Sequence, residues 1–176
     1  AYCAEPEQTV EEIKRWGVSV VMGNCEESLA SNAPECGCGF AADSTCALLS
    51  EHWYAFSSRR VSDASRRWMQ QLPRSIHLRF NGCSILLVHG SPTAINRFVF
   101  ASTEASRKRR EFTPIDVDVI IGGHSGIPFG QRIGSKYWLN TGVIGMPAND
   151  GTQDGWYLLL TAEGPALRAS WRRLIY

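Results

Sequence analysis

The sequence predicts a mixed α/β fold in which helices cover packed sheets. Helical patterns alternate with short apolar runs in the first half of the chain, and consecutive strands follow in the second half. A chain of 176 residues is long enough to bury one full core. We therefore expect a single domain over residues 1–176.

Composition and charge exclude several classes of protein. The chain carries 18 basic and 17 acidic residues, so no overall charge directs it to nucleic acid or to a membrane surface. No apolar run approaches the roughly 20 residues of a membrane helix, and the first residues, AYCAEPEQ, lack the basic-then-apolar pattern of a signal peptide. We expect a cytoplasmic protein with reduced thiols, although six cysteines could form disulfides in a secreted chain.

The first half of the chain is predicted to contain three helices and one strand. Apolar residues recur there at helical spacing, and Ser44 and Ser62 stand where a side chain can cap a helix. Val18–Met22 is a continuous apolar run, which is typical of a buried strand. Residues 28–40 are rich in small residues and are predicted as a loop. The predicted helices are Glu5–Trp16, Ser44–Ser57 and Ser62–Leu72.

The second half is predicted to consist mainly of strands. Asn81-Gly82 is a strong hairpin signal, and Glu163-Gly164-Pro165 predicts the turn of a closing hairpin. One basic helix is expected over Thr103–Phe112. The predicted strands are Ser75–Phe80, Cys83–Val88, Val117–Ile121, a pair on either side of Gly134-Ser135, Gly155–Thr161 and Ala166–Leu174.

Three apolar runs each lead into a glycine and a residue that can ligate a metal ion. Asn24, His89 and His124 occupy these positions. Because ligands of open α/β sheets gather at the carboxyl ends of the strands, we expect the three side chains to converge. Imidazole nitrogen and amide oxygen are both acceptable ligands for mid-series divalent ions. The sequence therefore predicts a metal site.

These motifs, in this order, resemble those of the calcineurin-like metallophosphoesterase superfamily, in particular its small bacterial and archaeal phosphodiesterases. The resemblance implies a β-sandwich flanked by helices that holds two divalent ions, with manganese, iron, nickel and zinc all compatible. It also implies that these ions activate water to hydrolyse a small phosphomonoester or phosphodiester. The matching segments are Gly23-Asn24-Cys25, Val88–Pro92, Gly122-Gly123-His124 and Asn140–Pro147.

The resemblance also assigns roles to individual residues. It implies that Asn24, His89 and His124 are metal ligands, with Asn24 and His89 serving catalysis directly. Two ions could clamp the phosphoryl oxygens during in-line attack, so no protein nucleophile is required. In agreement, the chain contains no Gly-x-Ser-x-Gly elbow and no phosphate-binding P-loop.

The sequence departs from the family pattern in two places. The family's Asp-x-His and Gly-Asp motifs have no counterpart before Asn24, and glycine occupies position 126, where the family has a second histidine. We therefore expect fewer than two tightly bound ions, absent N-terminal strands, and a sheet edge beside Val18–Met22 that is covered by another chain in a homo-oligomer. The alternative function is a catalytically inactive binding module that uses the cysteine-rich loop.

For several residues near these motifs, two interpretations remain open. Cys25 is either a thiol that orients substrate or acts as an acid, or a small buried residue. Asn96 and Arg97 follow His89 where relatives shape the substrate pocket, and an arginine there could hold a phosphate.

Two interpretations also remain open for a cluster of cysteines and for a run of basic residues. Cys25, Cys36, Cys38 and Cys46 are either free thiols or part of a structural or redox site. The run Arg107–Arg110 either contacts phosphates or nucleic acid or forms a solvated helix face.

Overall fold

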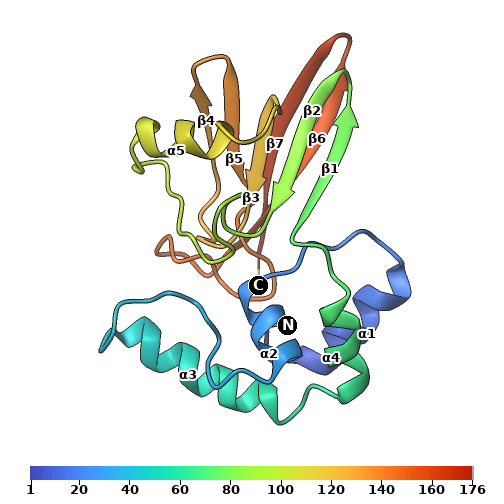
Figure 1. Ribbon diagram of the computed structural model, residues 1–176, viewed down its shortest axis with the longest axis vertical. Helices are drawn as coiled ribbons and strands as arrows, with labels where there is room; N and C mark the ends of the chain where they lie inside the picture. Colours follow the sequence, from blue (N-terminus) through green and yellow to red (C-terminus); the bar gives the residue numbers. More distant parts are fainter. Residues whose placement is uncertain (176) are drawn as a thin grey trace. The chain divides into compact units, whose positions relative to one another are not determined.

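The structure is a computed structural model that describes residues 1–175. It contains two compact units, Ala1–Arg74 and Ser75–Tyr176. The first unit is helical and the second contains two sheets and one helix (Figure 1). None of the helices in the described residues is both long and apolar enough to cross a bilayer. The prediction of a single domain over residues 1–176 stays a prediction.

The N-terminal unit consists of four helices with recognisable end signals. Pro6 begins the first helix, where a missing N–H costs nothing, and Gly17 ends it with a φ of 63°. The predicted caps are present, since the hydroxyl oxygens of Ser44 and Ser62 accept hydrogen bonds from backbone N–H groups three residues later, each at 3.1 Å. The helices are α1 (Pro6–Trp16), α2 (Asn24–Ser31), α3 (Thr45–Ser58) and α4 (Asp63–Gln70).

The core of this unit joins all four helices to the cysteine-containing loop. Leu29 and Met69 are fully buried where α2 meets α4, and the Tyr54 hydroxyl donates to the Ala33 carbonyl at 2.8 Å. The other buried members of the core include Val10, Cys25, Cys36, Cys38 and Val61. The loop therefore packs as part of the core rather than as a solvated connection.

Two predictions for this unit are wrong. Val18–Met22 is not a strand: residues 18–23 form no regular structure, and Val18 is 54% exposed. An apolar run becomes a strand only when another strand pairs with it, and none does so in the described residues; Met22 N–H instead donates to the Pro73 carbonyl. The predicted loop at residues 28–40 was also placed too early, because α2 continues to Ser31.

The C-terminal unit contains a five-stranded mixed sheet and a separate two-stranded sheet. The strand order of the larger sheet is β1-β2-β3-β5-β4, so its edges are β1 and β4 and not the Val18–Met22 segment. Asn81 and Gly82 have φ of 49° and 81° in the predicted hairpin turn. The elements are β1 (Ser75–Phe80), β2 (Cys83–Val88), α5 (Ala105–Phe112), β3 (Val119–Gly122), β4 (Phe129–Ile133), β5 (Lys136–Asn140), β6 (Gly155–Glu163) and β7 (Ala166–Leu174).

The larger sheet is covered on both faces. On one face, Ile85, Val119, Ile121 and Leu139 pack against apolar side chains of β6 and β7. On the other, Leu86, Ile120 and Trp138 pack with Phe112 of α5 and with the segment that contains Val99. Successive residues of β2 and β3 alternate between the two cores because strand side chains alternate between faces. The fold is thus the predicted mixed α/β arrangement of packed sheets with helices (Figure 1).

Candidate metal and substrate site

The two predicted histidines follow adjacent parallel strands. His89 comes directly after β2, and His124 follows β3 by two residues. The strands pair in parallel with Leu87 opposite Ile121, so their carboxyl ends meet at the same sheet edge. The main chain continues this pairing past the strands, because the N–H groups of Gly123 and His124 both donate to the His89 carbonyl, at 2.7 and 2.9 Å.

The side chains of His89 and His124 face each other. Nε2 of His89 lies 3.0 Å from Nδ1 of His124, and the rings meet at 61°. Two nitrogens that bind one ion at about 2.0–2.1 Å are separated by about 3 Å when they subtend an angle of about 90–110°. The pair therefore fits a shared divalent ion. Without an ion, a single proton between the two nitrogens would give a hydrogen bond.

Phe98 packs against His124 of the pair. Its ring lies 4.3 Å from the ring of His124, centroid to centroid, and is parallel to that of Phe100 at 6.0 Å. An apolar ring against an imidazole restricts its rotation and excludes water from one face. The predicted role of Phe98 as core or pocket wall is consistent with this packing.

Gly90 permits the turn that follows His89. A Cβ on this residue would lie 2.4 Å from the Ile95 carbonyl oxygen and 2.7 Å from the Arg97 nitrogen, both main-chain atoms. Only glycine can occupy this position without moving the loop. The loop that carries Asn96 and Arg97 therefore folds back against Gly90.

The loop after His124 is fixed by a buried asparagine that the sequence did not single out as a positioning residue. Asn140, 2% exposed at the end of β5, donates to the Ser125 hydroxyl at 2.8 Å and accepts from Gly142 N–H at 2.9 Å. Ser125 in turn donates to the Val99 carbonyl at 2.7 Å. Gly126 follows with a φ of 69°, a conformation that a histidine would adopt only with strain.

Asn24 and Cys25 belong to the N-terminal unit, at the start of α2. Asn24 is 3% exposed, and its amide Nδ2 donates to the Cys36 carbonyl at 2.9 Å. Burial, followed by the charge of Glu26, raises the pKa of the Cys25 thiol. In the protein alone Cys25 is therefore neutral at physiological pH, which favours its interpretation as a small buried residue.

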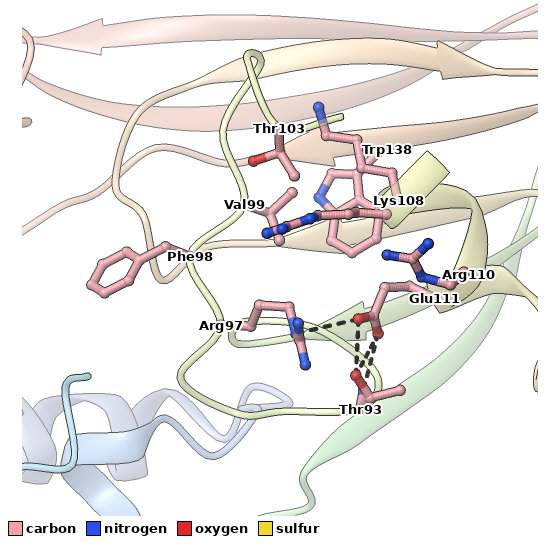
Figure 2. Close-up of a pocket in the computed structure, with 10 residues that line it drawn as sticks. Thr93, Arg97, Phe98, Val99, Thr103, Lys108, Arg110, Glu111 and Trp138 are labelled. Carbon is pink, nitrogen blue, oxygen red and sulfur yellow. Dashed lines mark hydrogen bonds and ion pairs between the residues drawn. The ribbon is translucent and has the colours of Figure 1, made fainter. Parts of the chain in front are cut away.

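Arg97 lines a pocket of about 580 Å³, and Asn96 precedes it in the same loop. Figure 2 shows Arg97 and Thr93 turned toward the Glu111 carboxylate. The Arg97 Nε lies 3.3 Å from Glu111 Oε1, and the Thr93 hydroxyl is within 2.9 Å of both carboxylate oxygens. The residues that line the pocket are Thr93, Arg97, Phe98, Val99, Thr103, Arg107, Lys108, Arg110, Glu111 and Trp138.

Two buried polar groups in this pocket were missed by sequence reasoning. Lys108 is 1% exposed; its ammonium donates to the Ala101 carbonyl at 3.1 Å and to Gln131, and burial lowers its pKa. Trp138 is fully buried, and its Nε1–H has no hydrogen-bond partner in residues 1–175. A buried donor without a partner costs about 1–3 kcal/mol, so Trp138 Nε1 is a donor that the described residues leave unsatisfied.

Comparison with known proteins identifies the family of this chain. The sequence profile of the Calcineurin-like phosphoesterase superfamily domain matches residues 3–164. The chain belongs to this superfamily. Membership confirms the resemblance seen in the motifs and indicates metal-dependent phosphoester hydrolysis in general.

Solved structures show the same fold. A metallophosphoesterase from Sphaerobacter thermophilus is 16% identical with a TM-score of 0.71, over 100% of this chain and 74% of that one. A hypothetical protein from Pyrococcus horikoshii OT3 is 18% identical with a TM-score of 0.67, over 96% of this chain and 69% of that one. At these identities the likeness concerns the fold alone. A comparison with curated protein sequences found no match.

Proposed function

We propose that this chain hydrolyses a small phosphomonoester or phosphodiester with a divalent ion held by His89 and His124. The observation that carries the proposal is the 3.0 Å separation of their facing nitrogens at the ends of two parallel strands. The motifs that supply both histidines lie within the segment that matches the superfamily. A bound divalent ion would polarise the phosphoryl group and lower the pKa of water enough to supply hydroxide at neutral pH.

The residues around the pair prepare it for this role. The strands and the two hydrogen bonds to the His89 carbonyl fix the backbone of both histidines. Phe98 keeps the imidazole of His124 in place and keeps water from one side of it. Manganese, iron, nickel and zinc are the candidate ions.

The substrate would enter the pocket beside α5. Arg97, Arg107 and Arg110 line it, and three guanidinium groups against the single carboxylate of Glu111 leave a net positive site. Guanidinium groups bind phosphate oxygens in a bidentate manner. Trp138 also lines the pocket, and its Nε1–H has no hydrogen-bond partner within residues 1–175. We therefore assign Arg97 to binding of an anionic substrate, with Asn96 beside it in the loop.

The direct test is hydrolysis of a chromogenic phosphodiester and a chromogenic phosphomonoester in the presence of Mn²⁺. His89→Ala and His124→Ala should each lower kcat/KM by at least about 100-fold, because removal of a ligand costs no less than loss of its supporting hydrogen bonds. His52→Ala and His77→Ala are matched controls, since both histidines are exposed and should leave activity unchanged. Equal activity in all four variants would contradict the proposal.

A second candidate function is a non-catalytic metal-binding module. Gly126 favours it, because the position of the family's second histidine holds a residue without a ligand atom and with a left-handed backbone. In that case the wild-type chain would bind Mn²⁺ in a manner that depends on His89 and His124, and neither chromogenic substrate would be hydrolysed above the rate of the His89→Ala variant.

A further inference from the structure

Three buried cysteines meet in the N-terminal unit, away from the histidines in sequence. The sulfur atoms of Cys25, Cys36 and Cys38 all lie within 4.8 Å of one another. Each residue is at most 6% exposed. Cys25 comes from the first turn of α2, whereas Cys36 and Cys38 come from the loop before α3, so the cluster joins two segments of the unit.

The sulfurs of Cys25 and Cys38 have the spacing of two ligands of a single metal ion. Cys25 Sγ lies 3.8 Å from Cys38 Sγ. Thiolates that bind one zinc ion at about 2.3 Å in a tetrahedral arrangement are separated by about 3.8 Å. Cys36 and Cys38 form a disulfide in the structure, with their Cα atoms 5.3 Å apart, so the expectation of reduced thiols is wrong for these two residues. The disulfide needs only the sulfurs of Cys36 and Cys38, so Cys25 contributes a third sulfur to the cluster.

Hydrogen-bond donors surround the sulfurs. The Asn24 amide Nδ2 lies 3.4 Å from Cys38 Sγ and 3.5 Å from Cys25 Sγ. The backbone N–H of Cys38 donates to Cys36 Sγ at 3.2 Å. N–H donors directed at sulfur stabilise thiolates bound to a metal, and such supporting bonds orient the ligands. The same Asn24 amide donates to the Cys36 carbonyl at 2.9 Å, so its second N–H is shared between the sulfurs of Cys38 and Cys25.

We propose that, when the disulfide is reduced, Cys25, Cys36 and Cys38 bind one thiophilic divalent ion of the zinc class. A dithiol or phosphine reductant supplies two electrons that cleave the Cys36–Cys38 bond, and two protons complete the two thiols. Binding of the ion then forms three metal–sulfur bonds and releases three protons, one from each thiol. The site cross-links α2 to the loop at residues 36–38, and it is independent of the proposed hydrolytic activity.

Spectroscopy with Co²⁺ as the probe tests this site. The His89→Ala/His124→Ala double variant, reduced under anaerobic conditions, isolates the cysteines from the histidine pair. It should bind one Co²⁺ per chain with a thiolate-to-cobalt charge-transfer band, and Zn²⁺ should displace it. Serine substitution of Cys25, Cys36 or Cys38 in this background should weaken binding by at least about 100-fold.

The remaining cysteines provide the matched control. Cys3, Cys46 and Cys83 lie outside the cluster, so their combined substitution by serine should leave the band unchanged. Absence of the band in the double variant, or its loss in this control, would overturn the proposal.

Thiol protection gives a readout that does not depend on the folding of variants. In the reduced wild-type protein, Zn²⁺ should protect Cys25, Cys36 and Cys38 from alkylation, as located by peptide mass spectrometry, and leave Cys46 reactive. Equal alkylation with and without Zn²⁺, or a Cys36–Cys38 bridge that persists in the folded protein under reductant, would refute the site.

Discussion

Nε2 of His89 and Nδ1 of His124 lie 3.0 Å apart, and the His124 N–H also donates to the His89 carbonyl at 2.9 Å. Main-chain pairing that continues from two parallel strands therefore holds the backbone of both histidines. Such rigidity matters for a metal site, because ligands that are already in place lose little conformational entropy when the ion binds.

Phe98→Ala should weaken metal binding without removing a ligand. The Phe98 ring restrains His124 at 4.3 Å, and loss of a group that orients a ligand typically lowers metal affinity by about 10–100-fold. Calorimetric titration with Mn²⁺ measures the change, and excess Mn²⁺ should restore most of the activity. Phe100→Ala is the control, since Phe100 contacts Phe98. An unchanged Mn²⁺ affinity in Phe98→Ala would show that the ring does not position His124.

Gly90→Ala should destabilise the protein by about 3 kcal/mol, because the added Cβ would lie 2.4 Å from the Ile95 carbonyl oxygen and main-chain atoms must move. Gly164→Ala is the control that measures the cost of backbone strain without a steric clash. Gly164 has a φ of 57° and open space around its Cβ position, so its substitution should cost only about 1 kcal/mol. Urea unfolding of both variants measures the difference, and equal costs would contradict the steric explanation.

Arg107→Ala should raise KM for an anionic substrate by about 10-fold, the effect of losing one charged hydrogen bond of about 1.4 kcal/mol, with kcat little changed. Arg109→Ala is the matched control, because Arg107 and Arg109 are both exposed on α5 and, of the two, only Arg107 lines the pocket. Steady-state kinetics at several salt concentrations distinguishes a specific contact from general charge. Equal KM values for the two variants would place the substrate elsewhere.

The sequence predicted those features whose signal in a few adjacent residues matches the structure that those residues adopt in the fold. Apolar runs that stop at glycine and histidine identified the ends of β2 and β3, and Asn81-Gly82 predicted the first hairpin. The parallel pairing of β2 and β3 then brought His89 and His124 together. In each case the signal lies in a few adjacent residues, and tertiary packing preserves it.

The features that were missed depend on partners distant in sequence. Val18–Met22 has the composition of a strand, but only pairing with another strand would make it one. Lys108 lies in a basic run that resembles a solvated helix face, yet it is 1% exposed because Gln131 and the Ala101 carbonyl satisfy its ammonium. The sequence likewise does not reveal that the Trp138 Nε1–H lacks a hydrogen-bond partner among the residues that the structure describes.

Asp118→Asn should lower stability at neutral pH but not in acid. The Asp118 carboxylate accepts hydrogen bonds from the Ser84 N–H at 2.8 Å and the Ser84 hydroxyl at 2.7 Å, which link the starts of β3 and β2. These bonds lower the pKa of Asp118. A carboxyl group whose pKa is lower in the folded state stabilises the protein above its unfolded pKa of about 3.9, and this stabilisation is lost as pH falls through the folded pKa.

The expected loss for Asp118→Asn at pH 7 is about 1 kcal/mol, a value reduced for the exposure of the side chain to solvent. The difference from wild type should shrink steadily below about pH 4. Urea unfolding at a series of pH values measures it. Asp116→Asn is the control, because its exposed pair with Lys136, at 3.6 Å, should contribute little at any pH. A difference between wild type and Asp118→Asn that does not change with pH would mean that the carboxylate charge plays no part in joining the two strands.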